Sequence, residues 1–254
     1  TNDIMARAVN FETPLPDSSI GVLCASADVQ ADRIEVLVNG YSNSQTWVVG
    51  FQIFYGSPTS ESLWNEVEQY LKTTWEHPSG QDLRITRSFI DSGYETGAVY
   101  NFCRKLEAIG VRAIKGVGGS NRAEVGRPTK NNTSRCNVFP LGVNTLKTQI
   151  LARLKIDDPK DSGFVHFPDF LDEEFFLQLT SERLIKRYVK GIPRMEFKQL
   201  RQRNEALDLM VYNLAAFRSL NANMSVIQKK LSEVRKSEPK KRPQTRAKNW
   251  ATNW

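Results

Sequence analysis

The sequence has 254 residues, of which 40% are hydrophobic and 25% are charged, which is typical of a globular chain with one large domain or two small ones. No apolar stretch reaches the length of about 20 residues that a membrane-spanning helix needs, and three scattered cysteines (Cys24, Cys103 and Cys136) exclude a disulfide framework or a cysteine-rich zinc site. The 35 Lys and Arg exceed the 28 Asp and Glu and give a net charge of +7, which favours a polyanionic partner. We expect an intracellular protein that uses no membrane, with Cys24 and Cys103 as small core residues.

The first part of the chain predicts a short linker followed by a β-meander. Residues 1–17 contain prolines and little periodicity, so we expect a linker there. Three β-rich stretches follow at residues 21–30, 32–41 and 46–56. Because their connections are short, we expect three antiparallel strands.

Helix and strand patterns alternate in the next part. Residues 61–75 and 96–109 have apolar side chains at helical spacing, and Gly110 is a suitable helix stop. Residues 83–91 and 111–116 predict strands. Such alternation predicts parallel strands on this side of the sheet.

The region from 117 to 137 predicts a long basic loop, because it is rich in Gly, Asn and Thr. Loops of this length are usually functional or disordered. Sequence-independent contacts to a DNA backbone are expected from its cationic side chains, Arg122, Arg127, Lys130 and Arg135.

The remaining patterns predict three helices, one short strand and a hairpin. The hairpin is expected across residues 183–200, because two alternating stretches flank Lys190 and Gly191. Residues 223–254 are rich in Lys and Arg and predict a flexible basic tail, either a solvated terminus without function or a docking or DNA-tethering segment. The helices and the strand are expected at residues 145–154, 172–180, 204–220 and 163–168.

Acidic residues occur where three of these elements are expected to meet. Asp28 ends the first strand, Asp91 ends the strand at 83–91, and Asp208 lies in the helix at 204–220 with Glu205 on the same helical face. The order of elements resembles the ribonuclease H-like nuclease core, a mixed α/β sheet of three antiparallel strands followed by parallel strands. In such a sheet the first and fourth strands are neighbours, so Asp28, Asp91 and Asp208 are expected to converge.

Converging carboxylates favour a divalent cation. Carboxylates close together raise one another's pKa values, and Mg²⁺ relieves this because it prefers hard oxygen ligands. Two such ions roughly 3.5–4 Å apart activate a water and stabilise the leaving oxygen in phosphodiester hydrolysis. With only two histidines, His77 and His166, the sequence does not favour a zinc site.

Each of these residues also has a structural interpretation. Asp91, followed by Ser92 and Gly93, is equally typical of a turn or helix cap. Glu205 is a metal ligand or a surface residue. Lys115 holds the scissile phosphate or steadies a carboxylate, or it is an exposed lysine at a strand end. The Gly-rich stretch from 115 to 121 lacks the Gly-Lys-Ser/Thr of a Walker A loop, so no nucleotide site is predicted.

Several motifs, in this order, resemble the large terminase subunit of tailed bacteriophages, in its lambda-like branch. They include "ADVQADRIEVLVNGY", "IDSGYETGAVYNFCR" and "RNEALDLMVYNLAAF", and the similarity runs from about Ile20 to about Leu220. The resemblance implies a ribonuclease H-like nuclease domain at 18–222, joined by residues 1–17 to an N-terminal ATPase domain that is absent from this chain. It also implies an endonuclease that cuts concatemeric viral double-stranded DNA during genome packaging in the host cell cytoplasm.

The same resemblance implies the ligands, cofactors and partners. Metal-binding acids map to Asp28, Asp91 and Asp208, with Glu205 as a less certain fourth, and two Mg²⁺ or Mn²⁺ ions are implied. The portal protein and the small terminase subunit are implied as partners, and the basic tail is implied to contact the portal. Another ribonuclease H-like nuclease or transposase, or a non-catalytic DNA- or portal-binding module, remains as an alternative.

Overall fold

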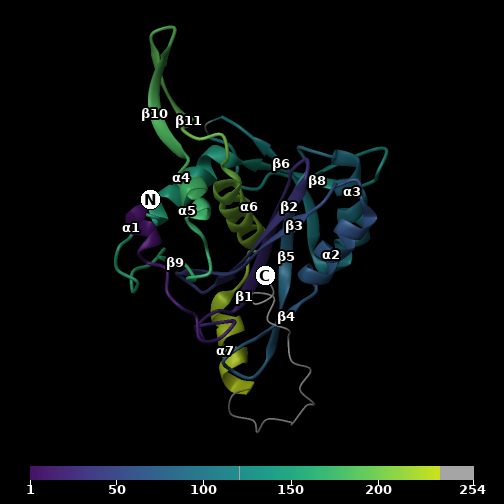
Figure 1. The fold of residues 1–254 in the computed structure, drawn as a ribbon, viewed down its shortest axis with the longest axis vertical. Coiled ribbons are helices and arrows are strands. Elements are labelled where there is room, and N and C mark those ends of the chain that lie inside the picture. The colour runs from purple at the N-terminus through teal and green to yellow at the C-terminus, as the bar shows by residue number, and fades with distance from the viewer. Residues whose placement is uncertain (120, 235–254) are drawn as a thin grey trace.

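The computed structural model describes residues 1–119 and 121–234. Its centre is a mixed sheet with the strand order β7-β8-β6-β5-β1-β2-β3-β9, in which β4 adds to β5 (Figure 1). The strands are β1 (Val22–Val29), β2 (Arg33–Tyr41), β3 (Thr46–Tyr55), β4 (Thr74–Glu76), β5 (Asp82–Asp91), β6 (Val111–Val117), β7 (Thr129–Lys130), β8 (Asn137–Gly142) and β9 (Val165–His166). The helices are α1 (Asn2–Met5), α2 (Glu61–Leu71), α3 (Thr96–Lys105), the 3₁₀ turn η1 (Glu107–Ile109), α4 (Val143–Arg153), α5 (Glu173–Leu179), α6 (Glu205–Leu220) and α7 (Met224–Val234).

The sheet has the predicted ribonuclease H-like topology. Strands β1, β2 and β3 form the antiparallel meander, while β5 pairs with β1 and β6 pairs with β5 in parallel. The neighbouring position of the first and fourth predicted strands is therefore confirmed. Gly110 ends the α3–η1 segment with φ of 90°, and a Cβ there would lie 2.2 Å from the carbonyl oxygen of Thr86, so only glycine fits.

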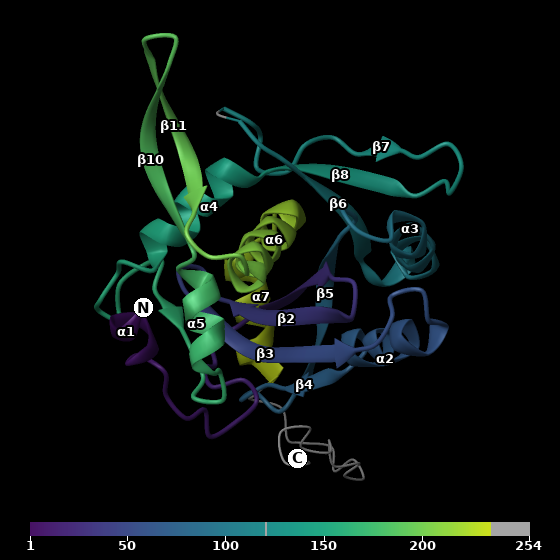
Figure 2. The ribbon, with the colours of Figure 1, turned by 45° about the horizontal axis from the view of Figure 1, so that its top comes forward.

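Helices cover both faces of the sheet, and each face has its own core. Strand residues pack with α2 and α3 on one face, and with α4, α5, α6 and α7 on the other (Figure 2). Because side chains alternate between faces along a strand, the same strands contribute to both cores. The predicted core residues Cys24 and Cys103 are buried on opposite faces.

Both ends of the described chain pack on the domain. In residues 1–17, predicted as a linker, Leu15 is fully buried and Arg7 forms an ion pair of 2.6 Å with Asp157. The predicted flexible tail begins with a helix, α7, whose Met224 and Leu231 are buried. Apolar residues at helical spacing within the basic stretch explain this correction. The rest of the predicted tail, residues 235–254, lies outside the described residues.

Two other segments also differ. The predicted loop at 117–137 contains β7, and β8 begins at its end and pairs in parallel with β6. Pro140 within β8 weakened the strand signal, because proline is disfavoured inside sheets. Helix α2 ends at Leu71, four residues before its predicted end, and Trp75 lies in β4.

The predicted hairpin is confirmed as β10 (Glu182–Val189) paired antiparallel with β11 (Ile192–Gln199). It forms a separate two-stranded sheet. In both views it projects away from the body of the domain, starting beside α4 and α5 and leading back into α6 (Figures 1 and 2). Most of its residues are exposed.

Candidate functional site

The parallel pairing of β1 and β5 places Asp28 and Asp91 side by side. Ser26 pairs with Phe89 and Ala27 with Ile90, so Asp28 and Asp91 follow at the same level of neighbouring strands. Residues in register on parallel strands point to the same face. The carboxyl ends of these two strands therefore carry neighbouring carboxylates on one face of the sheet.

Helix α6 brings Asp208 to the same face. The Ser26 hydroxyl donates a hydrogen bond of 2.7 Å to the carbonyl oxygen of Leu209, the residue after Asp208. Further along the helix, Asn213 donates to the carbonyl oxygens of Cys24 and Leu37, both at 3.1 Å, and accepts one of 2.9 Å from the Tyr41 hydroxyl. These buried hydrogen bonds fix the helix across β1 and β2. We name Asp28, Asp91 and Asp208 the acidic edge.

The electrostatics of the acidic edge confirm that its members are neighbours. Burial raises the pKa of Asp28 to about 7, a hydrogen bond of 2.6 Å from the Gln30 side chain opposes this rise, and the charges of Asp91 and Asp208 add to it. Burial also raises the pKa of Asp91, and the charge of Asp208 adds to the rise. The phenol of Tyr212 has its pKa raised by burial and then by the charges of all three acids.

Lys147 is the cation nearest to Asp208, and the sequence patterns did not reveal it. Its Nζ lies 3.1 Å from Oδ1 of Asp208 and 2.6 Å from Oε1 of Glu182. Asn204 donates to both carboxylates, at 3.0 Å and 2.9 Å. Burial raises the pKa of Asp208, and Lys147 opposes that rise. The signal in the sequence was a lysine at a core position of a helix, four residues after Val143 and three before Ile150.

Glu205, the predicted fourth acid, belongs to a different cluster. Its Oε1 lies 2.9 Å from Nη2 of Arg33, and its Oε2 lies 3.3 Å from Nε of Arg203. Both arginines also bind Oε1 of Glu35, at 2.7 Å and 2.9 Å. Asn204 is the N-cap of α6, and Glu205, the first residue of the helix, faces these arginines. Glu182 instead interacts with the acidic edge, because its charge adds to the rise in the pKa of Asp208.

Glu35 is a second residue that the sequence patterns missed. It pairs directly with Asp28 across β1 and β2, and it is 1% exposed. Its Oε2 has no hydrogen-bond partner within the part of the chain that the structure describes. An acid between Ile34 and Val36 was the available signal, because both neighbours are fully buried. Burial raises the pKa of Glu35.

The predicted phosphate-binding residues do not gather in one place: some lie near the carboxyl ends of the parallel strands and others near their amino ends. Lys115 lies at the same edge as Asp91, but Asp91 pairs with Ile114, so Lys115 alternates to the opposite face. Arg122 is exposed beside the carboxyl end of β8, where the Gly142 amide donates to the Ala123 carbonyl at 3.0 Å.

The other three loop cations lie farther from the acidic edge. Arg127 follows Gly126, whose amide donates to the carbonyl of Pro140 midway along β8. Lys130 pairs with Asn137 at the opposite end of β8, and Arg135 lies just before that end. Of the four loop cations, Arg122 is therefore the one beside the carboxyl end of β8, the end at which the parallel strand β5 carries Asp91.

The donor chemistry of the acidic edge fits a hard divalent cation, but its geometry is not preformed. Within residues 1–119 and 121–234, no group of three or more His, Cys, Asp or Glu side chains is arranged to hold a metal ion. Gln30 engages Asp28, while Lys147 and Asn204 engage Asp208. Asp28 is buried and Asp91 and Asp208 are partly exposed, and such neighbouring carboxylates are nevertheless the ligand type that Mg²⁺ and Mn²⁺ prefer. Because each carboxylate oxygen has two lone pairs, a bound ion could share Asp28 and Asp208 with their present partners.

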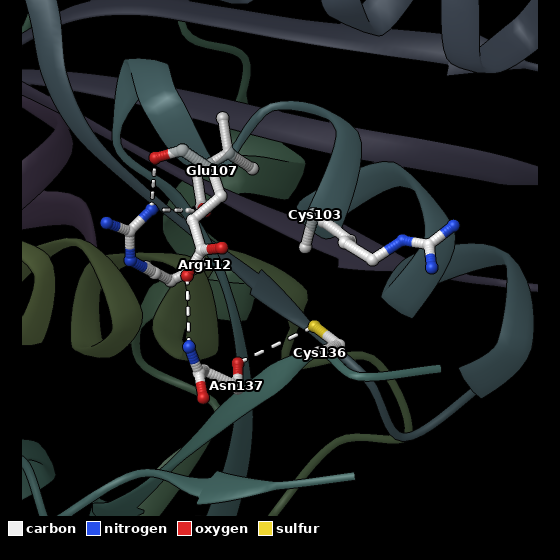
Figure 3. A pocket seen from close by; sticks show the side chains of 7 residues that line it. Cys103, Glu107, Arg112, Cys136 and Asn137 are labelled. Atoms are coloured by element: carbon white, nitrogen blue, oxygen red, sulfur yellow. Dashed lines mark hydrogen bonds between the residues drawn. The ribbon is translucent and has the colours of Figure 1, made fainter. Parts of the chain in front are cut away.

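A second cluster, at the opposite end of the sheet, is structural (Figure 3). Arg112 donates to the Glu107 carbonyl at 2.6 Å, and the Asn137 amide donates to the Glu107 carboxylate at 3.0 Å. The side chains around Glu107, Arg112 and Asn137 fill the pocket between α3, β6 and β8, and the pocket does not admit a water molecule. The cluster joins η1 to the starts of β6 and β8, and we assign it no chemistry.

No helix in the described residues is both long enough and apolar enough to cross a membrane.

The chain is similar in sequence to known terminase large subunits. The chain is 31% identical over 225 residues to the terminase large subunit of Escherichia phage lambda and 29% identical over 226 residues to that of Enterobacteria phage P21. Both alignments cover 85% of this chain and 35% of the relative, so the chain spans about a third of their length. A Mn-soaked human cytomegalovirus terminase nuclease domain superposes with a TM-score of 0.46 at 12% identity, covering 90% of this chain and 97% of that one.

The family assignment comes from the sequence. The family model for the endonuclease domain of the terminase large subunit gpA matches residues 1–230, which is most of the chain. The chain therefore belongs to the terminase large subunit gpA endonuclease domain family.

Proposed function

We propose that this chain is a metal-dependent endonuclease that cuts concatemeric viral double-stranded DNA during genome packaging. The observation that supports it best is the gathering of Asp28, Asp91 and Asp208, from two strands and one helix, at one edge of the sheet. Carboxylates placed close together without a cation lower stability, so their gathering at one place favours a role in chemistry.

The acidic edge would hold two Mg²⁺ or Mn²⁺ ions, with Asp28, Asp91 and Asp208 as ligands. When bound, such ions supply water activation and stabilise charge on the reacting phosphate. The chain's own residues orient the site: Asn213 fixes α6, and the backbone amide of Gly93 binds the Asp91 carboxylate. Lys147 balances the charge of Asp208 and Glu182 and is a positioning residue. Arg122 would contact the DNA backbone.

The wider assembly is part of the same proposal. The relatives from phages lambda and P21 are named as terminase large subunits. We infer that this chain works in the host cytoplasm with an ATPase domain, a portal protein and a small terminase subunit. The basic residues 235–254 would contribute to docking on the portal.

Plasmid cleavage tests the proposal with two substitutions at opposite ends of one strand. Asp91→Asn removes a ligand from the carboxyl end of β5, while Asp82→Asn removes an exposed carboxylate from its first residue. We expect the wild type to nick or linearise plasmid with Mg²⁺ or Mn²⁺ and not with EDTA. Asp91→Asn should lose at least about a hundredfold in rate, because ligand loss exceeds the 10- to 100-fold effect of removing an outer-shell partner, whereas Asp82→Asn should keep the wild-type rate.

Thermal unfolding with and without Mn²⁺ supplies a readout that does not depend on cleavage. An ion that binds only the folded state raises the free energy of unfolding by an amount that grows with the logarithm of its concentration divided by its Kd. The wild type and Asp82→Asn should be stabilised by Mn²⁺, and Asp91→Asn should not. Cleavage by Asp91→Asn at the wild-type rate would overturn the proposal and favour a non-catalytic DNA- or portal-binding module.

A further inference from the structure

The β10–β11 hairpin is a defined projection whose base touches the candidate site. Its first residue, Glu182, forms an ion pair with Lys147, which also contacts Asp208. At its tip, Lys190 and Gly191 have φ of 52° and 78°. Two successive residues with positive φ are what a two-residue turn requires in order to fix the strand register. The positions of the hairpin's side chains are therefore set by the turn at one end and the ion pair at the other.

The exposed part of the hairpin is strongly cationic on one face. The register pairs Arg183 with Lys198 and Arg187 with Arg194. Because the two pairs are separated by an even number of residues, all four side chains share a face, and all four are exposed. The hairpin also contains two acids, Glu182 at its base and Glu196. Its six cations are Arg183, Lys186, Arg187, Lys190, Arg194 and Lys198.

Pairing like charges in this way destabilises an isolated hairpin. Like charges directly opposite each other on neighbouring strands repel, and a two-stranded hairpin is marginally stable by itself. Glu196 offsets part of the repulsion, with its carboxylate 3.2 Å from Arg187. Within the described residues, Arg183, Arg194 and Lys198 form no ion pair. A polyanion bound to this face would relieve the repulsion.

The spacing of the two cation pairs favours a nucleic acid duplex over an acidic protein surface. The pairs are four residues apart along the strand, which is about 13 Å at about 3.3 Å per residue. The major groove of DNA is about 12 Å wide and admits a two-stranded β-ribbon. Phosphates on both sides of one groove can therefore meet both pairs, whereas an acidic protein surface has no such fixed repeat.

We propose that this cationic face, formed by Arg183, Arg187, Arg194 and Lys198, binds the phosphates of double-stranded DNA. The hairpin then acts as an arm that holds the duplex beside the acidic edge. The inference rests on the proposed function for the identity of the polymer. Its contacts are to the backbone, so binding is independent of base sequence.

The test measures binding of the full chain to a short fluorescein-labelled DNA duplex by anisotropy, in EDTA so that cleavage cannot contribute. The hairpin variant carries Arg183→Gln, Arg187→Gln, Arg194→Gln and Lys198→Gln. Because each phosphate contact contributes about 0.9 to the slope of log affinity against log salt, four lost contacts should lower that slope by about 3 to 4. Affinity at low salt should fall at least tenfold.

Two further variants isolate the cause. A charge-matched control removes four exposed cations from the body of the domain, as Arg84→Gln, Arg104→Gln, Lys155→Gln and Lys160→Gln, and should keep the wild-type slope. A variant with Arg183→Lys, Arg187→Lys and Arg194→Lys keeps the charge and should also keep most of the slope. All variants should unfold at the wild-type temperature, since the substituted side chains are exposed.

The outcomes separate this inference from the proposed function. Equal slopes for the wild type and the hairpin variant would overturn the inference and point to a protein partner for the arm, even if plasmid cleavage proceeds. Hairpin-dependent DNA binding without cleavage in any divalent ion would support the inference and overturn the proposed nuclease activity.

Discussion

The two faces of strands β1 and β2 are built from alternate residues of the same segments, yet their chemistry is opposite. Towards α2 and α3 the buried side chains are all apolar: Leu23, Ala25, Ala27, Val29, Ile34, Val36 and Val38. Towards α6 they include polar and charged groups: Ser26, Asp28, Glu35 and Asn39. Burying a polar group lowers stability unless it is paired, so the first face stabilises the fold and the second places reactive groups.

Helix α6 makes the polar face of β1 and β2 possible. Asn213 and the carbonyl of Leu209 pair with groups of β1 and β2, so α6 satisfies polar groups that would otherwise be orphaned. The acids at the end of this face are only partly compensated, by Gln30 at Asp28 and by Lys147 and Asn204 at Asp208. Substitutions on the two faces should therefore affect stability and cleavage differently.

The largest change in stability is expected on the apolar face. Leu23 is fully buried, and Leu23→Ala should lower the free energy of unfolding by about 2–5 kcal/mol, because it removes buried methyl groups and leaves a cavity. Urea denaturation measures this loss. Cleavage assayed at a temperature where the variant is folded should remain at the wild-type rate. A large loss of cleavage there would show that the apolar face also controls the site.

A smaller loss is expected where the polar face is held together. Asn213→Leu leaves the Tyr41 hydroxyl without its acceptor and should lower the free energy of unfolding by about 1–3 kcal/mol. Cleavage should fall as well, because α6 positions Asp208. Ser219→Ala, near the end of the same helix, serves as the control and should change stability by under about 0.5 kcal/mol. Full activity in Asn213→Leu would show that α6 needs no such anchor.

The smallest expected change in the free energy of unfolding is an increase. Asp28→Asn removes a buried carboxylate that is repelled by Asp91, Asp208 and Glu35. Without divalent ions it should raise the free energy of unfolding by about 1 kcal/mol, or by about 2–4 °C in unfolding temperature for a chain of this size. Cleavage should be lost. A lower unfolding temperature for Asp28→Asn than for the wild type would mean that Asp28 is a structural residue.

Much of the fold was predictable because local signals were consistent. Alternating apolar residues and short connections predicted the β1–β2–β3 meander, helical spacing and Gly110 predicted the α3–η1 segment, and Lys190-Gly191 predicted the hairpin turn. Where the local signal was weak or mixed, the prediction was wrong. Strand β8 contains a proline, and α7 combines a basic composition with buried Met224 and Leu231. Tertiary packing decided both.

The sequence alone determined the residue types and their order: acids at two strand ends and within a late helix, and a motif set that identifies the family. Only the tertiary structure decided which charges meet. It paired Lys147 with Asp208 and Glu205 with the arginines of a separate cluster. The reason is physical: periodicity along the chain fixes the face on which a residue lies, whereas a charge finds its partner through the packing of elements distant in sequence.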